Sequence, residues 1–224
     1  MRENLENLVV LITAQTFFIT AHSIMLTVAS LVGEDLSVDK SLATLPLSTL
    51  MLGTVLATIP ASMLMKYVSR RKGFIFGTLL AIIGAAVCMQ AISIRSFHLF
   101  LVGTLLVGMF NGFCQLYRFA AAELVAPALK GKAISYVLAG GIIAGLIGPR
   151  LGAFSRDIFE TAFVGPYLVI GVLGLMTAIV MGFLDMGPAP VQSATDKPRA
   201  LTEIARQPIF IVAATSATAA SPSC

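Results

Sequence analysis

The chain has 224 residues, of which 57% are hydrophobic and 12% are charged, and its formal net charge is +4. Because soluble domains carry about 25% charged residues, this composition argues against a soluble enzyme or a nucleic acid-binding domain. The three cysteines, Cys88, Cys114 and Cys224, have no metal-ligand spacing and suggest no disulfide framework. We therefore expect neither a metal site nor a cofactor.

Six apolar stretches follow one another along the chain with almost no charge inside them. A helix needs about 20 apolar residues to cross the ~30 Å hydrocarbon core of a bilayer, and each stretch is close to that length. The stretches cover residues 8–32, 42–65, 74–93, 97–122, 133–151 and 162–184. The sequence therefore predicts an all-α membrane protein, in which residues 1–184 form a bundle of six transmembrane helices in the lipid bilayer.

The composition changes after the sixth stretch. Residues 185–207 are rich in proline, alanine, serine and charge, which predicts a flexible cytoplasmic linker. Residues 208–224 begin a new apolar run that soon becomes rich in serine, threonine and alanine. Because this run is too short and too polar to span a bilayer, we expect an incomplete seventh helix and a truncated chain.

Lysine and arginine are distributed unequally between the two ends of the predicted helices. With the N-terminus in the cytoplasm, ten lie on the cytoplasmic side: Arg2, Lys66, Arg70, Arg71, Lys72, Lys130, Lys132, Lys197, Arg199 and Arg206. Four lie on the opposite side: Lys40, Arg95, Arg150 and Arg156. Since short cytoplasmic loops carry the excess of positive residues, we expect a multi-pass protein of the cell (inner) membrane with a cytoplasmic N-terminus.

The fourth stretch contains the one ionised side chain inside the predicted spans. Residues at steps of three and four share one face of a continuous helix, and five of them form a stripe here: Thr104, Gly108, Asn111, Gln115 and Arg118. A guanidinium within the membrane faces a bundle interior or a wet cavity, which favours contact with a substrate or a coupling ion. The alternative is a structural arginine that binds backbone carbonyls or extends to the interface.

The first stretch carries two polar faces. Hydroxyl residues form the first: Thr13, Thr16, Thr20, Ser23, Thr27 and Ser30. Because small hydroxyl residues allow helices to approach closely, we interpret this face as packing. Gln15 and His22 form the second face. An imidazole ordinarily titrates near pH ~6.5 and suits proton coupling, whereas a buried histidine that only forms hydrogen bonds would leave the same pattern.

The fifth stretch is rich in glycine. Gly141 and Gly145, and again Gly148 and Gly152, are small residues four apart, which is the spacing of close helix contacts. Pro149 lacks an N–H donor and bends a helix. Such a helix can act as a pivot or simply form a tight seam, and the glycines alone do not decide between the two.

Two motifs carry a family resemblance. The loop after the second stretch matches the basic end of G-x-L-a-D-R-x-G-R-R/K at Arg70, Arg71 and Lys72. It departs from that pattern at three positions, Ser62, Lys66 and Ser69. The fifth stretch matches G-x-x-x-G-P-x-x-G at Gly148, Pro149 and Gly152, with Ala144 in place of the first glycine. With the order and sidedness of the stretches, these motifs resemble the N-terminal half of a major facilitator superfamily transporter of the drug or antiporter kind.

The resemblance implies two six-helix bundles, each built from 3+3 inverted repeats, with a small-molecule substrate between them. It also implies a secondary active transporter that exports small organic molecules by alternating access in exchange for protons. The residues expected to line the cavity are Arg118, Gln115, Asn111, Thr104, Gln15 and His22. The residues expected in a gating loop are Lys66, Arg70, Arg71, Lys72 and Glu123, with Arg70 paired to Glu123.

A six-helix half has an exposed face that expects a partner, either a second half or a second copy of the chain. The alternative is an inactive half-length fragment. An intramembrane enzyme would need an activated nucleophile or a zinc helix, and the sequence contains neither G-x-S-x-G nor H-E-x-x-H. We therefore expect a transporter and not an enzyme.

Overall fold

The computed structural model describes residues 2–125 and 129–185, and these residues form helices without any strand. The helices are α1 (Arg2–Leu36), the 3₁₀ helix η1 (Lys40–Leu42), α2 (Leu45–Tyr67), α3 (Arg70–Ser93), α4 (Phe97–Cys114), α5 (Tyr117–Glu123), α6 (Lys130–Ser155) and α7 (Val164–Gly182). They supply six segments long and apolar enough to cross a membrane. The predicted all-α six-helix bundle is confirmed. Apart from Asp185, the predicted linker and seventh helix lie outside the described residues.

Several helices extend beyond the apolar stretches that predict them. Helix α3 begins at Arg70 instead of residue 74, so the basic residues of the loop motif occupy its first turn. The side chain of Ser69 caps this helix by accepting a hydrogen bond from the backbone N–H of Lys72 at 3.3 Å. A helix can leave the hydrocarbon without ending, because its backbone hydrogen bonds continue into the polar interface.

The fourth span is not the single helix that the sequence predicts. Helix α4 ends at Cys114 and α5 begins at Tyr117, although both belong to one membrane-capable segment. At the break, the N–H of Leu116 donates to the carbonyl of Phe113 at 3.1 Å, three residues back, which is the tighter 3₁₀ pattern. Arg118 lies beside the break, and its Nε donates to the carbonyl oxygen of Gln115 at 3.2 Å.

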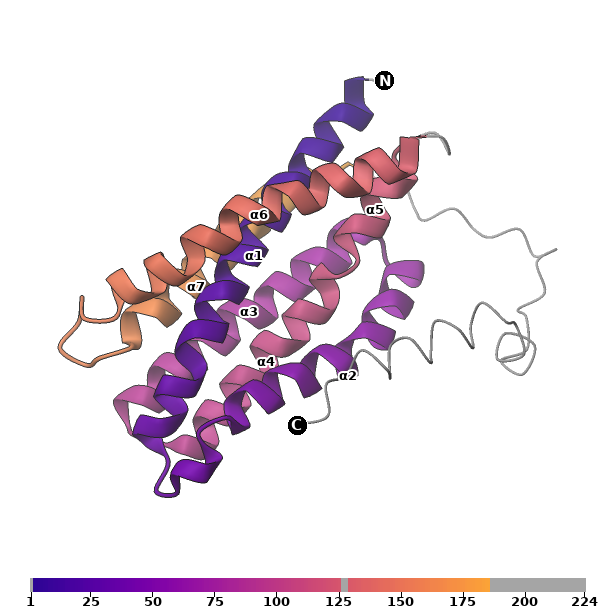
Figure 1. Ribbon diagram of the computed structural model, residues 1–224. Helices are drawn as coiled ribbons and strands as arrows, with labels where there is room; N and C mark the ends of the chain where they lie inside the picture. The colour runs from indigo at the N-terminus through magenta and orange to yellow at the C-terminus, as the bar shows by residue number, and fades with distance from the viewer. Residues whose placement is uncertain (1, 126–128, 186–224) are drawn as a thin grey trace, which may run out of the picture. The chain divides into compact units, whose positions relative to one another are not determined.

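The helices form two triplets, and the first helix of each triplet packs against the second and third helices of the other triplet. The first triplet is α1, α2 and α3, and the second is α4 with α5, then α6 and α7. Helix α2 packs on α4, and in the same way α6 packs on α1 (Figure 1). Helix α3 packs on α4, α7 packs on α1, and α3 and α7 pack on each other. The repeated pairing confirms the predicted 3+3 inverted repeat.

Close backbone contacts join α2 to α4 and α1 to α6. A Cβ added to Gly108 of α4 would lie 2.9 Å from the carbonyl carbon of Leu50 in α2, and one added to Gly148 of α6 would lie 2.9 Å from the carbonyl oxygen of Thr20 in α1. Hydroxyl groups bridge the same seams. Thr54 donates to the carbonyl of Gly108 at 3.1 Å, and Thr16 donates to that of Gly140 at 3.2 Å. Thr16 and Ser23 of the hydroxyl face in α1 therefore pack against α6, whereas Thr27 is exposed and bonds within its own helix.

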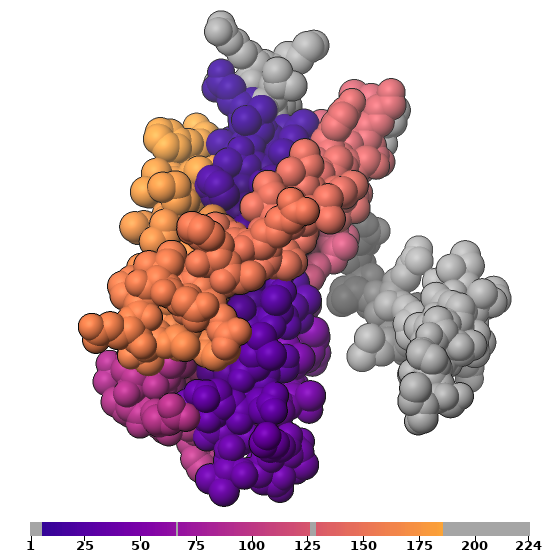
Figure 2. All heavy atoms as spheres, turned by 60° about the vertical axis from the view of Figure 1, so that its left-hand side comes forward, coloured from indigo at the N-terminus to yellow at the C-terminus, as the bar shows by residue number. Residues whose placement is uncertain are grey.

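Figure 2 shows α6, in orange, lying across α1, in indigo. Of the six membrane-capable segments, those that contain α2 and α6 are the least buried. Only 22% and 28% of their most apolar 18-residue stretches are buried inside the bundle. Their outward side chains are large and apolar, and include Val55 and Ile59 of α2 and Ile142 and Leu146 of α6. These two helices therefore present the broadest apolar faces to the surroundings of the bundle.

Candidate functional site

The contact between α1 and α4 joins two polar residues that the sequence assigns to the cavity. Asn111 Nδ2 lies 3.0 Å from Nδ1 of His22. Because an amide nitrogen only donates, Nδ1 accepts this bond and the imidazole carries its proton on Nε2. Phe18 packs against the imidazole, with the ring centroids 5.7 Å apart, and meets Phe110 edge to face at 5.8 Å. Aromatic rings therefore fix the pair from one side.

The helix break joins two more of these residues. Arg118 Nη2 donates to the side-chain oxygen of Gln115, while Nε donates to the backbone carbonyl of the same residue. This contact is the backbone-carbonyl arrangement that the sequence leaves open as an alternative to a substrate role. A guanidinium has five N–H donors, so Arg118 keeps further donors for another group. No carboxylate among the side chains that the structure describes forms an ion pair with Arg118.

The other two candidate cavity residues are deeply buried. Thr104 is fully buried, with its Oγ1 2.6 Å from Oγ1 of Thr49, so it lies inside the seam between α2 and α4. Gln15 is 7% exposed and shares a face of α1 with Phe18 and His22. The structure therefore brings Asn111 to His22 and Gln115 to Arg118, and it places Thr104 apart from both pairs.

The predicted contact between Arg70 and Glu123 is present. Arg70 Nη2 forms an ion pair with Oε1 of Glu123, which joins the start of α3 to the end of α5. The side chain of Arg70 is only 12% exposed, and its Nε has no partner among the described residues. Arg71 and Lys72 are exposed, and Lys66 lies in the last turn of α2.

The glycines of the fifth stretch face α1 along one line. Gly141 lies against Ile19, Gly148 against Ser23 and Thr20, and Gly152 against Ile24. Gly145, also on this line, has looser contact, since an added Cβ would meet Ile19 only at 4.0 Å. Helix α6 continues through Pro149 without interruption. These contacts show that the glycines form a tight seam between α6 and α1. A role of α6 as a pivot stays a prediction.

A sequence model of the Major Facilitator Superfamily matches residues 11–221. The chain belongs to this superfamily. Membership makes it a multi-pass membrane protein of a transporter family and not an enzyme. Over 210 residues the chain is 34% identical to the riboflavin transporter RfnT of Brucella anthropi, covering 92% of this chain and 52% of that protein. The chain thus spans about half the length of this superfamily relative. No solved structure matches the chain significantly.

Two structural features of this chain were not predicted from its sequence. The break after Cys114 has no proline to signal it, and the nearest glycine, Gly112, lies inside α4. A buried Asn7 binds the backbone of Asp185, and the available signal was its position on the inward face of α1, four residues before the buried Leu11. Among the described residues, no group of three His, Cys, Asp or Glu side chains could hold a metal ion.

Proposed function

We propose that this chain is one half of a secondary active transporter that moves a small organic solute across the inner membrane by alternating access. The observation that carries the proposal is the polar contact of α1 with α4, where His22 meets Asn111 inside an otherwise apolar bundle. Polar groups in a bilayer are costly, so their presence favours function. Arg118 and Gln115, seven and four residues further along the same span, extend this polar line.

We propose riboflavin, or a solute of similar chemistry, as the substrate. The named relative transports riboflavin, and it matches 92% of this chain. A flavin ring presents carbonyl oxygens and ring nitrogens, and its side chain presents hydroxyls. Amide groups and a guanidinium can satisfy both kinds of group. Arg118, Gln115 and Asn111 would bind the solute, with Gln15 beside them on α1.

We propose that His22 couples transport to protons. Its Nδ1 accepts the hydrogen bond from Asn111, so a proton placed on Nδ1 would face a donor and break that bond. Protonation would therefore loosen the contact of α1 with α4. The glycine and proline motif of α6 supports export in exchange for protons, as expected for the antiporters that it resembles.

We propose that a second six-helix bundle completes the transporter, supplied by another chain segment or by a second copy. The apolar outward faces of α2 and α6 and the half-length match support this partner. We place the N-terminus in the cytoplasm, because this orientation gives the cytoplasmic loops most of the lysines and arginines. The Arg70–Glu123 pair, with Lys66, Arg71 and Lys72, would then form a cytoplasmic gate.

The proposal is tested in right-side-out membrane vesicles loaded with riboflavin. We expect riboflavin to leave faster when the outer solution is more acidic than the interior. Arg118→Ala should abolish this movement while the protein still inserts, and Arg150→Ala, which removes an exposed arginine of α6, should leave it intact. Normal movement by the Arg118 variant would remove this residue from the substrate path.

The same assay separates the possible partners. Transport by the chain alone, together with a dimer in cross-linking, supports two copies. Transport only on co-expression of a second six-helix bundle supports a separate half. Absence of transport in both arms favours the inactive half-length fragment.

A further inference from the structure

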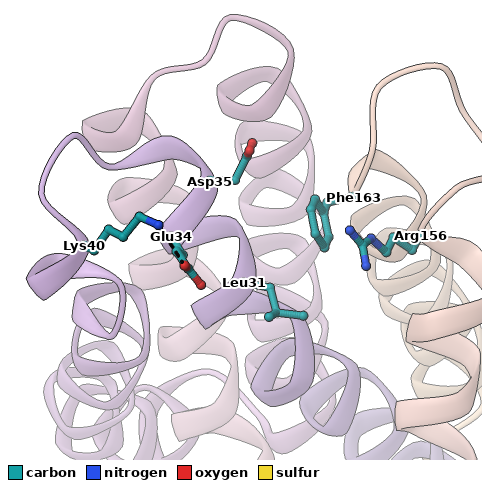
Figure 3. A pocket seen from close by; sticks show the side chains of 6 residues that line it. All are labelled: Leu31, Glu34, Asp35, Lys40, Arg156 and Phe163. Atoms are coloured by element: carbon teal, nitrogen blue, oxygen red, sulfur yellow. Dashed lines mark ion pairs between the residues drawn. The ribbon is translucent and has the colours of Figure 1, made fainter.

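A charged pocket lies at the end of the bundle opposite the Arg70–Glu123 pair. It has a volume of about 380 Å³, which falls in the ~300–1,000 Å³ range of small-molecule sites. The end of α1, η1 and the loop between α6 and α7 form it, and its lining residues are Leu31, Glu34, Asp35, Lys40, Arg156 and Phe163 (Figure 3). None of them belongs to the proposed path through the bundle.

The charges of this pocket are loosely paired. Lys40 Nζ lies 3.6 Å from Oε1 of Glu34, and Arg95 Nη2 lies 3.4 Å from Oδ2 of Asp35. All four side chains are about half exposed or more. Loose exposed ion pairs contribute little to stability, so a ligand can replace their contacts at small cost.

The guanidinium of Arg156 lies against a buried ring. Its Cζ lies 4.5 Å from the ring centroid of Phe163, and Figure 3 shows the guanidinium beside this ring. Phe163 is 7% exposed, whereas the side chain of Arg156 is 49% exposed. Within the described residues its one charged partner is Asp157, at 3.7 Å from Nε. The Phe163 ring therefore covers one side of the guanidinium, and about half of the Arg156 side chain remains exposed.

The backbone is strained around this pocket. Among the described residues, the two non-glycine residues with positive φ are Arg95, at 52°, and Phe163, at 69°. The first binds Asp35 through both its carboxylate and its backbone carbonyl, at 3.4 and 3.1 Å, and the second supports Arg156. Strained backbone of this kind persists where surrounding contacts impose it, and it gathers at ligand sites. Both loops are thus fixed in place around the pocket walls.

We infer that this pocket binds a planar, hydroxylated heteroaromatic solute outside the bundle, as an access site on the transport route. The solute's ring would stack on the side of the Arg156 guanidinium that Phe163 does not cover, since planar guanidinium groups stack on aromatic rings. Its hydroxyls would donate to the carboxylates of Glu34 and Asp35, and Lys40 would donate to a ring carbonyl. The choice of solute rests on the proposed transport of a flavin-like molecule.

The test uses the full chain in lipid nanodiscs and riboflavin, whose own fluorescence reports binding. Arg118→Ala serves as the background, because it removes binding along the proposed inner path. In that background we expect riboflavin still to bind. Adding Arg156→Ala should weaken this binding about tenfold, the loss of one cation–π contact. Adding Arg156→Lys, which keeps the charge but not the planar group, should weaken it as well.

Arg150→Ala in the same background is the matched control and should bind like the parent. Equal binding by the Arg156 variants and the parent would overturn the inference, even if transport were normal. Absence of any riboflavin binding in the Arg118→Ala background would overturn it too. Binding that depends on Arg156 supports the access site even if the vesicle assay detects no transport. The two tests can therefore fail independently of each other.

Discussion

Asn7 and Asp185 form a two-bond clamp across 178 positions of the chain. Asn7 Nδ2 donates to the carbonyl oxygen of Asp185 at 2.7 Å, and the N–H of Asp185 donates to Asn7 Oδ1 at 2.9 Å. Asn7 is 4% exposed whereas Asp185 is exposed, so both bonds are partly shielded from water. The clamp ties the first helix of the bundle to the residues that follow the last one.

Replacing Asn7 by alanine should destabilise the bundle by about 2 kcal/mol, because two partly shielded hydrogen bonds are lost. Thermal unfolding in detergent measures the change. Gln90→Ala removes an exposed amide of α3 and should leave the midpoint unchanged. An Asn7 variant that unfolds at the wild-type temperature would show that the clamp adds no stability.

Removing one partner of the Arg70–Glu123 pair should cost about 1 kcal/mol, since the pair is only partly buried. We expect Arg70→Glu and Glu123→Arg each to lower the unfolding midpoint and the double exchange to recover much of the loss. Arg71→Glu changes a neighbouring exposed arginine and tests for a general charge effect. Additive losses in the double variant would contradict a direct interaction.

The glycine seams should be intolerant of a single methyl group. Gly108→Ala would place a Cβ 2.9 Å from the carbonyl carbon of Leu50, a backbone atom that cannot move aside, so we expect a loss of about 3 kcal/mol. Gly182→Ala is the matched control in α7, because an added Cβ meets nothing within 4 Å there. Unfolding midpoints in detergent report both variants. A Gly108 variant as stable as the Gly182 variant would show that the seam can relax.

His22→Gln should separate proton coupling from solute binding. Glutamine retains hydrogen-bonding capacity towards Asn111 but has no group that titrates near neutral pH. We expect riboflavin binding to persist and the effect of a pH gradient on transport to disappear. His98→Gln, at the exposed end of α4, should leave the pH response intact. A full pH response in the His22 variant would assign coupling to another residue.

The lengths of the apolar runs predicted the fold, because the length of an uncharged run directly reflects bilayer thickness. The glycines around Gly148 were compatible with a pivot or with a tight seam, and only the contacts with α1 show the seam. The Arg70–Glu123 contact followed from the family motif and not from spacing. The break at Gln115 was not predictable in this way, because the apolar run continues through it without a change in composition. The pocket around Arg156 was missed because three separate segments contribute to it.

The seams of α2 with α4 and of α1 with α6 have a mechanical consequence. Where main chains touch through Gly108 and Gly148, one helix cannot slide past the other without forcing carbonyl groups into collision. Each of these two helix pairs is thus stiff. In any conformational cycle each pair would move as one unit, and the displacement would fall at contacts outside the two seams.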